Sequence, residues 1–176
     1  MNLPAKRRLL GGVEAGHPGG HALHRAARGR ARAGRAVVAL VAARRVTSKW
    51  TFIYGGALLA GWDLFLDPQM VAAGRWTWEV TGSHIPFVPD VPLSNFFGWL
   101  LAGCAIISLL NVALPFERRK ESASLRAVTL LLAWVLVSGF IGNLFFFDRP
   151  GLAFLGALVF GAFATPFIYK NWLGEA

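Results

Sequence analysis

The sequence predicts an all-α protein, a polytopic bundle of about four transmembrane helices preceded by a basic N-terminal tail. Of its 176 residues, 55% are hydrophobic and only 15% are charged, whereas average soluble domains have roughly 45–50% and about 25%. The hydrophobic residues are concentrated in nearly uncharged stretches long enough to cross a bilayer. The positive charge is concentrated elsewhere: residues 1–49 carry 11 Lys/Arg and one acid, and residues 50–176 carry 7 and 8. This composition excludes a disordered, collagen-like or disulfide-stapled chain.

Residues 1–45 form the basic tail, which is rich in Ala, Arg and Gly. No aromatic residue precedes Trp50, so the segment cannot bury enough apolar surface to offset its conformational entropy, and we expect it to be disordered. A short helix over Ala33–Val46 fits the sequence but is too short to span a membrane. Two interpretations stay open: a cytoplasmic basic tail beside the membrane, or a mis-called start of the reading frame.

Two other functions of the tail are not expected. Lys6-Arg7-Arg8 resembles the start of a signal peptide, but Leu9-Leu10 is followed by two glycines and Glu14, and no apolar core follows. The charge alone would suit nucleic acid, but no aromatic residue or recognisable binding module accompanies it. We therefore expect no nucleic-acid partner.

Four apolar stretches follow the tail. At 1.5 Å per residue, their 17 to 21 residues give about 26 to 32 Å, close to the thickness of a hydrocarbon core. They are predicted to be membrane spans at Trp50–Leu66, Asn95–Pro115, Ala127–Phe147 and Gly151–Tyr169.

The distribution of Lys and Arg predicts the orientation of these spans. Cations precede the first span, fill the connection between the second and third, and follow the fourth: Arg44, Arg45, Lys49, Arg118, Arg119, Lys120, Arg126 and Lys170. The opposite side has only Arg75 and Arg149. We therefore expect a multi-pass cell-membrane protein with both termini cytoplasmic.

The connection Asp67–Ser94 is expected outside. Pro68 disfavours a helical conformation at Asp67, so the first span is predicted to end there. Asp67 would then cap a separate short helix, with Pro68 at its first position and Gly74 at its end.

Asp63 and Asp67 are the candidate chemical groups. They are four residues apart, which puts both carboxylates on one face of a helix. An ionisable group within a span is by default a functional hypothesis. The alternative for Asp63 is a structural position close to the headgroups or paired with Arg75, and the alternative for Asp67 is the helix cap.

Other polar residues suggest structural roles. We expect Asn95, Asn111 and Asn143 to form hydrogen bonds between helices, with Asn95 on the same side of the membrane as the aspartates. His84 is weak evidence for a metal, Cys104 is alone, and no phosphate loop or catalytic motif is present. We expect no metal and no cofactor.

Three runs carry a resemblance to a known family: Gly61-Trp-Asp-Leu-Phe-Leu-Asp-Pro-Gln-Met-Val, Gly74-Arg-Trp-Thr-Trp-Glu79 and Val91-Pro-Leu-Ser-Asn-Phe-Phe-Gly-Trp-Leu100. Together they resemble the integral-membrane carotenoid biosynthesis hydratases, of the γ-carotene or bisanhydrobacterioruberin hydratase type. The resemblance covers about Val46 to Tyr169. Because members of that family are usually larger, the chain resembles their C-terminal portion. Pro89-Asp90 departs from the aromatic-Gly pair expected before Val91.

The resemblance implies that water adds to the terminal double bond of an acyclic carotenoid end group and gives a tertiary alcohol. Such a reaction needs a proton donor and a base, and a carboxyl group desolvated beside tryptophans can stay neutral and donate. Asp63 fits the donor and Asp67 the base. The expected substrate-binding residues are Trp62, Trp76, Trp78, Asn95 and Trp99.

Other functions stay open. The same chain could be a non-enzymatic carotenoid-binding or scaffold subunit, in which the acids serve structure only, or less readily a small transporter component. As part of a larger fold, it is expected to be weakly active alone and to need self-association or missing N-terminal spans. Asp63→Asn discriminates the first two functions, because a scaffold tolerates it and a hydratase does not.

Overall fold

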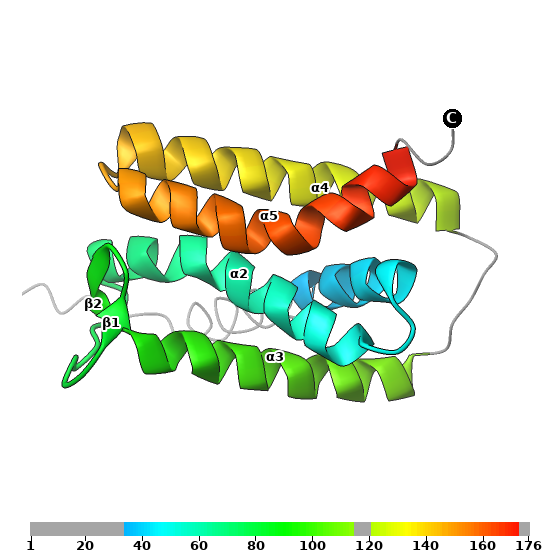
Figure 1. Ribbon diagram of the computed structural model, residues 1–176, viewed down its shortest axis with the longest axis horizontal. Helices are drawn as coiled ribbons and strands as arrows, with labels where there is room; N and C mark the ends of the chain where they lie inside the picture. Colours follow the sequence, from blue (N-terminus) through cyan, green and yellow to red (C-terminus); the bar gives the residue numbers. More distant parts are fainter. Residues whose placement is uncertain (1–33, 115–120, 173–176) are drawn as a thin grey trace, which may run out of the picture. The chain divides into compact units, whose positions relative to one another are not determined.

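The computed structural model describes residues 34–114 and 121–172 (Figure 1). All of them belong to one compact unit, Ala33–Ala176. A helix at 34–46 is followed by α2 (Thr51–Ala72), a hairpin of β1 (His84–Ile85) and β2 (Val88–Pro92), α3 (Leu93–Ala113), α4 (Glu121–Ile141), the π-helix η2 (Gly142–Phe146) and α5 (Pro150–Trp172). The prediction of an all-α helical bundle is confirmed.

Three helices in the described part of the chain are long and apolar enough to cross a membrane: Leu93–Ala113, Leu125–Phe146 and Pro150–Asn171. They correspond to the second, third and fourth predicted spans. The helix of the first predicted span, α2, has 22 residues and is long enough at about 33 Å. It is not among the three, because Asp63 and Asp67 lower its apolar character.

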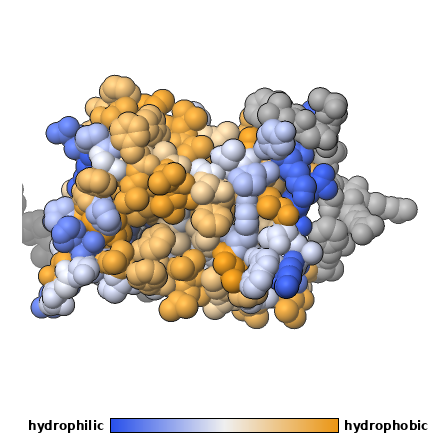
Figure 2. Space-filling model, viewed as in Figure 1, coloured by the Kyte–Doolittle hydropathy of each residue, from blue (hydrophilic) through white to orange (hydrophobic). Residues whose placement is uncertain are grey.

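The surface has the polarity of a membrane protein. On the face drawn in Figure 2, hydrophobic side chains cover the middle of the helices, and hydrophilic side chains gather at both ends. Many large apolar side chains on α3, α4 and α5 are exposed, among them Leu101, Leu109, Val112, Trp134, Phe154 and Leu158. Lipid is the solvent that suits such a surface.

The predicted end of the first span at Asp67 is wrong. α2 continues through Pro68 to Ala72, so Asp67 is a helix-interior residue and caps no separate helix. Buried Asp67 has side-chain partners of its own, and Arg149 Nη1 donates to the Pro68 carbonyl at 3.1 Å. We attribute the continuation to these tertiary contacts, which outweigh the local preference of a residue before proline.

Gly74 marks a helix end, although the helix that ends there is α2 and not the predicted separate short helix. Its φ is +63°, in the left-handed region where glycine is favoured. The Gly74 N–H donates to the Val71 carbonyl and the Arg75 N–H to the Met70 carbonyl, both at 2.9 Å. This pair of hydrogen bonds is the Schellman pattern of a helix C-terminus.

α2 is the central helix, because it packs against both α3 and α5 (Figure 1). It crosses α3 where Gly56 faces Gly103: a Cβ on Gly103 would lie 3.0 Å from the Gly56 Cα and carbonyl oxygen. Further along α2, the Phe65 ring lies against Gly139 of α4 and Gly156 of α5. Glycines thus allow the close helix packing expected of membrane bundles.

The helix at 34–46 corrects the expectation that residues 1–45 bury too little apolar surface to be ordered. The short helix predicted over Ala33–Val46 forms, and Ala39, Leu40 and Ala42 are buried in the same core cluster as Leu58 of α2 and Phe160 of α5. Its small side chains let backbones approach closely, which a count of large apolar residues does not detect. The expected disorder of residues 1–33 lies outside the described residues.

The three asparagines differ. Asn95 bonds from α3 to Asp67 of α2, and Asn111 accepts from Arg44 Nε at 2.8 Å, so both predicted interhelical bonds are confirmed. The prediction for Asn143 is wrong, because its Nδ2 donates to the Gly139 carbonyl one turn earlier. Its buried Oδ1 has no hydrogen-bond partner among the residues that the structure describes.

Candidate functional site

A narrow crevice lies where α2, α3 and the hairpin meet. Its walls include four of the residues expected at the site, Asp63, Asp67, Asn95 and Trp99. The other lining residues are Ala60, Leu64, Ile85 and Phe96. The four-residue spacing on α2 therefore brings both carboxylates to one crevice. In this conformation the crevice is too narrow for a water molecule.

Asp67 is the most enclosed polar group of the site. Its side chain is 2% exposed, and each carboxyl oxygen accepts a hydrogen bond. Trp76 Nε1 donates to Oδ1 at 3.0 Å, and Asn95 Nδ2 donates to Oδ2. These donors offset the loss of water around a buried carboxyl group. Asp67 is therefore held in a fixed orientation by a loop residue on one side and by α3 on the other.

Asp63 lies deeper in the bundle than the sequence suggested. α2 extends nine residues beyond it, so it is not at the helix end. Its Oδ1 lies 3.9 Å from Nη1 of Arg35, whereas Arg75 was the expected alternative partner. The sequence reasoning missed Arg35 because it lies in the segment read as a tail. The pair could have been predicted from Arg35 at the start of a short apolar run and the acid Asp63 within the following span, because a buried acid needs a cation as partner.

The tryptophans expected to bind substrate are dispersed. Trp99 lines the crevice, and the indole of Trp76 is 40% exposed while its N–H contacts Asp67. Trp62 packs edge-on against Phe160 at a centroid distance of 6.1 Å, because a residue next to Asp63 points about 100° away around the helix. Trp78 is exposed and is not a crevice residue.

The hairpin covers one wall of the crevice. Ile85 lines it, and Val88 and Val91 are buried with Leu64 of α2 in a second core cluster. At the turn, Phe87 has a positive φ of 67°, and its ring lies where a side chain on Gly151 would be. The hairpin is therefore anchored to the start of α5.

Metal-binding groups are sparse. The described residues contain no group of three or more His, Cys, Asp and Glu that could hold a metal ion. His84 is exposed, and its Nδ1 lies 3.0 Å from the Ile85 carbonyl oxygen.

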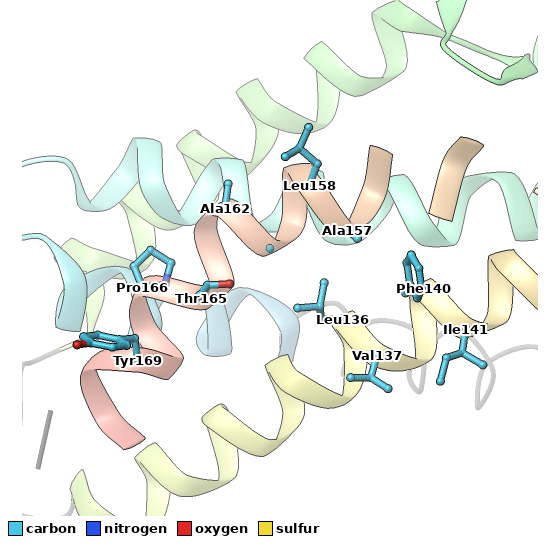
Figure 3. A pocket seen from close by; sticks show the side chains of 11 residues that line it. Leu136, Val137, Phe140, Ile141, Ala157, Leu158, Ala162, Thr165, Pro166 and Tyr169 are labelled. Atoms are coloured by element: carbon cyan, nitrogen blue, oxygen red, sulfur yellow. The ribbon is translucent and has the colours of Figure 1, made fainter. Parts of the chain in front are cut away.

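A second, larger hollow lies between α4 and α5 (Figure 3). It is an open groove of about 890 Å³, lined mainly by apolar side chains such as Leu136, Phe140 and Leu158. The small residues Ala157 and Gly161 of α5 also line it. Its lining contains no carboxyl group, whereas Asp63 and Asp67 line the crevice on α2.

Apolar helices long enough to cross a membrane, with a pair of buried carboxylates among them, are the features of a helical membrane protein. The comparisons with known proteins make this specific. Residues 26–163 match the family described as "Carotenoid biosynthesis protein", and the chain belongs to that family. The resemblance was expected to begin at about Val46, but the family match begins 20 residues earlier, at residue 26.

One similar relative is the bisanhydrobacterioruberin hydratase of Haloarcula japonica, with 36% identity over 88 residues. The alignment covers 48% of this chain but 27% of the relative. The chain therefore spans about a quarter of the length of that hydratase. No solved structure matches the chain.

Proposed function

We propose that this chain adds water to the terminal double bond of an acyclic carotenoid end group and produces a tertiary alcohol. Membership of the carotenoid biosynthesis family and the similarity to a hydratase support this activity. The observation that carries the proposal is the crevice that holds Asp63 and Asp67 one helical turn apart. Two carboxyl groups can supply the acid and the base that hydration needs.

In the proposed reaction, Asp63 donates a proton to the less substituted carbon of the double bond, and the other carbon becomes a tertiary carbocation. Water adds to this carbon and gives up a proton to Asp67. Return of the proton from Asp67 to Asp63 restores both groups, so the net change is the addition of one water molecule to the substrate. No electrons are transferred, so the step needs no redox cofactor. The hydrogen bonds from Trp76 and Asn95 support this role, because they hold the Asp67 carboxyl group in one orientation.

The substrate would enter from the membrane. A carotenoid is a long apolar polyene, and the exposed surface of α3 beside the crevice is apolar. Because the crevice is narrow, Phe96 and Trp99 on α3 must move to admit an end group. Trp99 and exposed Trp76 are the aromatic rings best placed to stabilise a carbocation.

The arrangement in the membrane is part of the proposal. In this arrangement, α2 crosses the membrane together with α3, α4 and α5. Both termini are cytoplasmic, and the crevice lies toward the outer end of the bundle. Further spans or a second copy complete the bundle, because the chain covers about a quarter of its hydratase relative.

The test is expression in a host that makes the unhydrated acyclic precursor. We expect the chain to give a low but measurable yield of hydroxylated carotenoid and Asp63→Asn to abolish it, because an amide cannot donate an acidic proton. Asp90→Asn is the matched control, since Asp90 is an exposed acid on the hairpin outside the crevice. Membrane levels of each variant are measured by immunoblot. Full conversion by Asp63→Asn would remove Asp63 from the mechanism.

A second candidate is a carotenoid-binding or scaffold subunit. It is favoured by Asp67, whose two oxygens are both occupied by protein donors, as in a purely structural carboxylate. This function predicts that the purified chain retains carotenoid, that no form hydrates it, and that Asp63→Asn binds as well as the wild type.

A further inference from the structure

Arg35 faces the proposed acid from a part of the chain that the hydratase chemistry does not use. Its Nη1 lies 3.9 Å from Asp63 Oδ1, and the two side chains are 24% and 12% exposed. We propose that Arg35 is a positioning residue, which holds the Asp63 carboxyl group in place on the crevice wall. This inference rests on the proposed function of Asp63.

The fold fixes Arg35 before any substrate binds. The helix at 34–46 buries Ala36, Ala39 and Leu40 almost completely. At its other end, Arg44 bonds to Asn111 at 2.8 Å and Arg45 to Asn171 at 3.2 Å. A short helix packed along its length and bonded at one end cannot shift easily, so the backbone that carries Arg35 is held close enough to α2 for the contact with Asp63.

An ion pair suits a carboxyl group that lies inside a bundle of apolar helices. An ionised carboxyl group in apolar surroundings is unfavourable unless it is paired. Arg35 therefore stabilises the carboxylate that Asp63 becomes once it has donated its proton. Arg is better suited than Lys to such a site, because its planar guanidinium is weakly hydrated and can hold a carboxylate in one orientation. Proton transfer requires that orientation, since a small displacement of a catalytic group lowers the rate strongly.

The pair also joins two segments of the fold. Asp63 is on α2 and Arg35 is on the preceding helix, so the contact fixes the position of one helix along the other. Asp67, one turn further along α2, is bonded to α3 through Asn95. Asp63 is thus held by the helix at 34–46, and Asp67 is held by α3. Loss of Arg35 should disturb Asp63 while leaving the Asp67 contacts in place.

The experiment compares Arg35→Gln, Arg35→Lys and Lys49→Gln with the wild-type chain in the precursor-producing host. We expect Arg35→Gln to lower hydration about a hundredfold and Arg35→Lys to restore part of it. Lys49→Gln, which removes an exposed cation beyond the end of the same helix, should hydrate normally. Hydration by Arg35→Gln equal to that of the wild type would overturn the inference.

A second measurement does not depend on activity. The thermal unfolding midpoint in detergent is compared for Arg35→Gln, Asp63→Asn and the double variant. Coupled groups give non-additive effects, so the double variant should be less destabilised than the sum of the two single variants. Additive effects would overturn the pairing. A wild-type chain that never hydrates but shows the coupling would refute the proposed function and leave the Arg35–Asp63 pair established.

Discussion

The crossing of α2 and α3 is the contact whose disruption can be predicted most sharply. An alanine at Gly103 would place its Cβ 3.0 Å from the Gly56 Cα and carbonyl oxygen, whereas unstrained carbon contacts are about 3.5–4.0 Å. The obstructing atoms belong to the backbone and cannot rotate away, so the helices must separate by about 0.5–1 Å. We expect Gly103→Ala to destabilise the bundle.

The magnitude follows from a control on the same helix. A Cβ on Gly98 meets nothing within 4 Å, so Gly98→Ala changes only helix propensity, by about 1 kcal/mol in favour of folding. Gly103→Ala gains the same propensity but also incurs the strain of overpacking, about 1–3 kcal/mol. The difference in unfolding free energy between the two variants therefore measures the strain at the contact. We expect Gly103→Ala to be less stable than Gly98→Ala by about 1–3 kcal/mol.

The assay is unfolding of the purified protein in mixed micelles by titration with SDS, followed by tryptophan fluorescence. The free energy of unfolding is compared between the two alanine variants and the wild type. Equal shifts for Gly98→Ala and Gly103→Ala would refute the reasoning, because they would mean that α2 and α3 do not approach closely at Gly103.

Two further predictions concern the site and the topology. Trp76→Phe keeps the ring but removes the donor to Asp67 Oδ1; we expect a loss of about 1–3 kcal/mol in unfolding free energy and lower hydration, and stability equal to that of the wild type would argue against the bond. For the topology, a reporter that works only in the cytoplasm should be active when it is fused after Ala176. Activity of a reporter that works only on the outer side would contradict the predicted orientation.

The sequence predicted those parts of the fold that depend on the solvent around each residue. The long apolar runs at α3, α4 and α5 were identified within a few residues, because a helix surrounded by lipid must be apolar on every face. Asp63 and Asp67 were found because helical periodicity puts them on one face. The sequence placed Asn95 on the same side of the membrane as the two aspartates. In the structure, its side chain donates a hydrogen bond to Asp67.

The parts that the sequence did not predict depend on contacts between distant residues. The rule for a residue before proline placed a helix end at Asp67, but α2 continues to Ala72. Arg35 meets Asp63 only because the helix at 34–46 folds back along α2. The π-helix η2 begins at Gly142 without a local signal that distinguishes it from the preceding α-helix.

The helix at 34–46 gives a decisive test, because the sequence and the structure disagree about it. Read as a tail, this segment should tolerate any substitution. In the structure, Leu40 is 1% exposed within the core cluster, and Val37 on the same helix is 42% exposed. Truncation of a buried leucine costs about 2–5 kcal/mol through lost contacts and the cavity left behind.

We therefore expect Leu40→Ala to lower the free energy of unfolding by about 2–5 kcal/mol and Val37→Ala to change it by less than about 0.5 kcal/mol. The two changes lie on one helix and delete similar side chains, so differences in expression or insertion signals affect them alike. The SDS titration used for the glycine variants measures both. If Leu40→Ala is as stable as Val37→Ala, the segment before Val46 does not belong to the core. In that case the position assigned to Arg35 beside Asp63 would also have to be abandoned, because buried Leu40 and its neighbours are what hold that helix against α2.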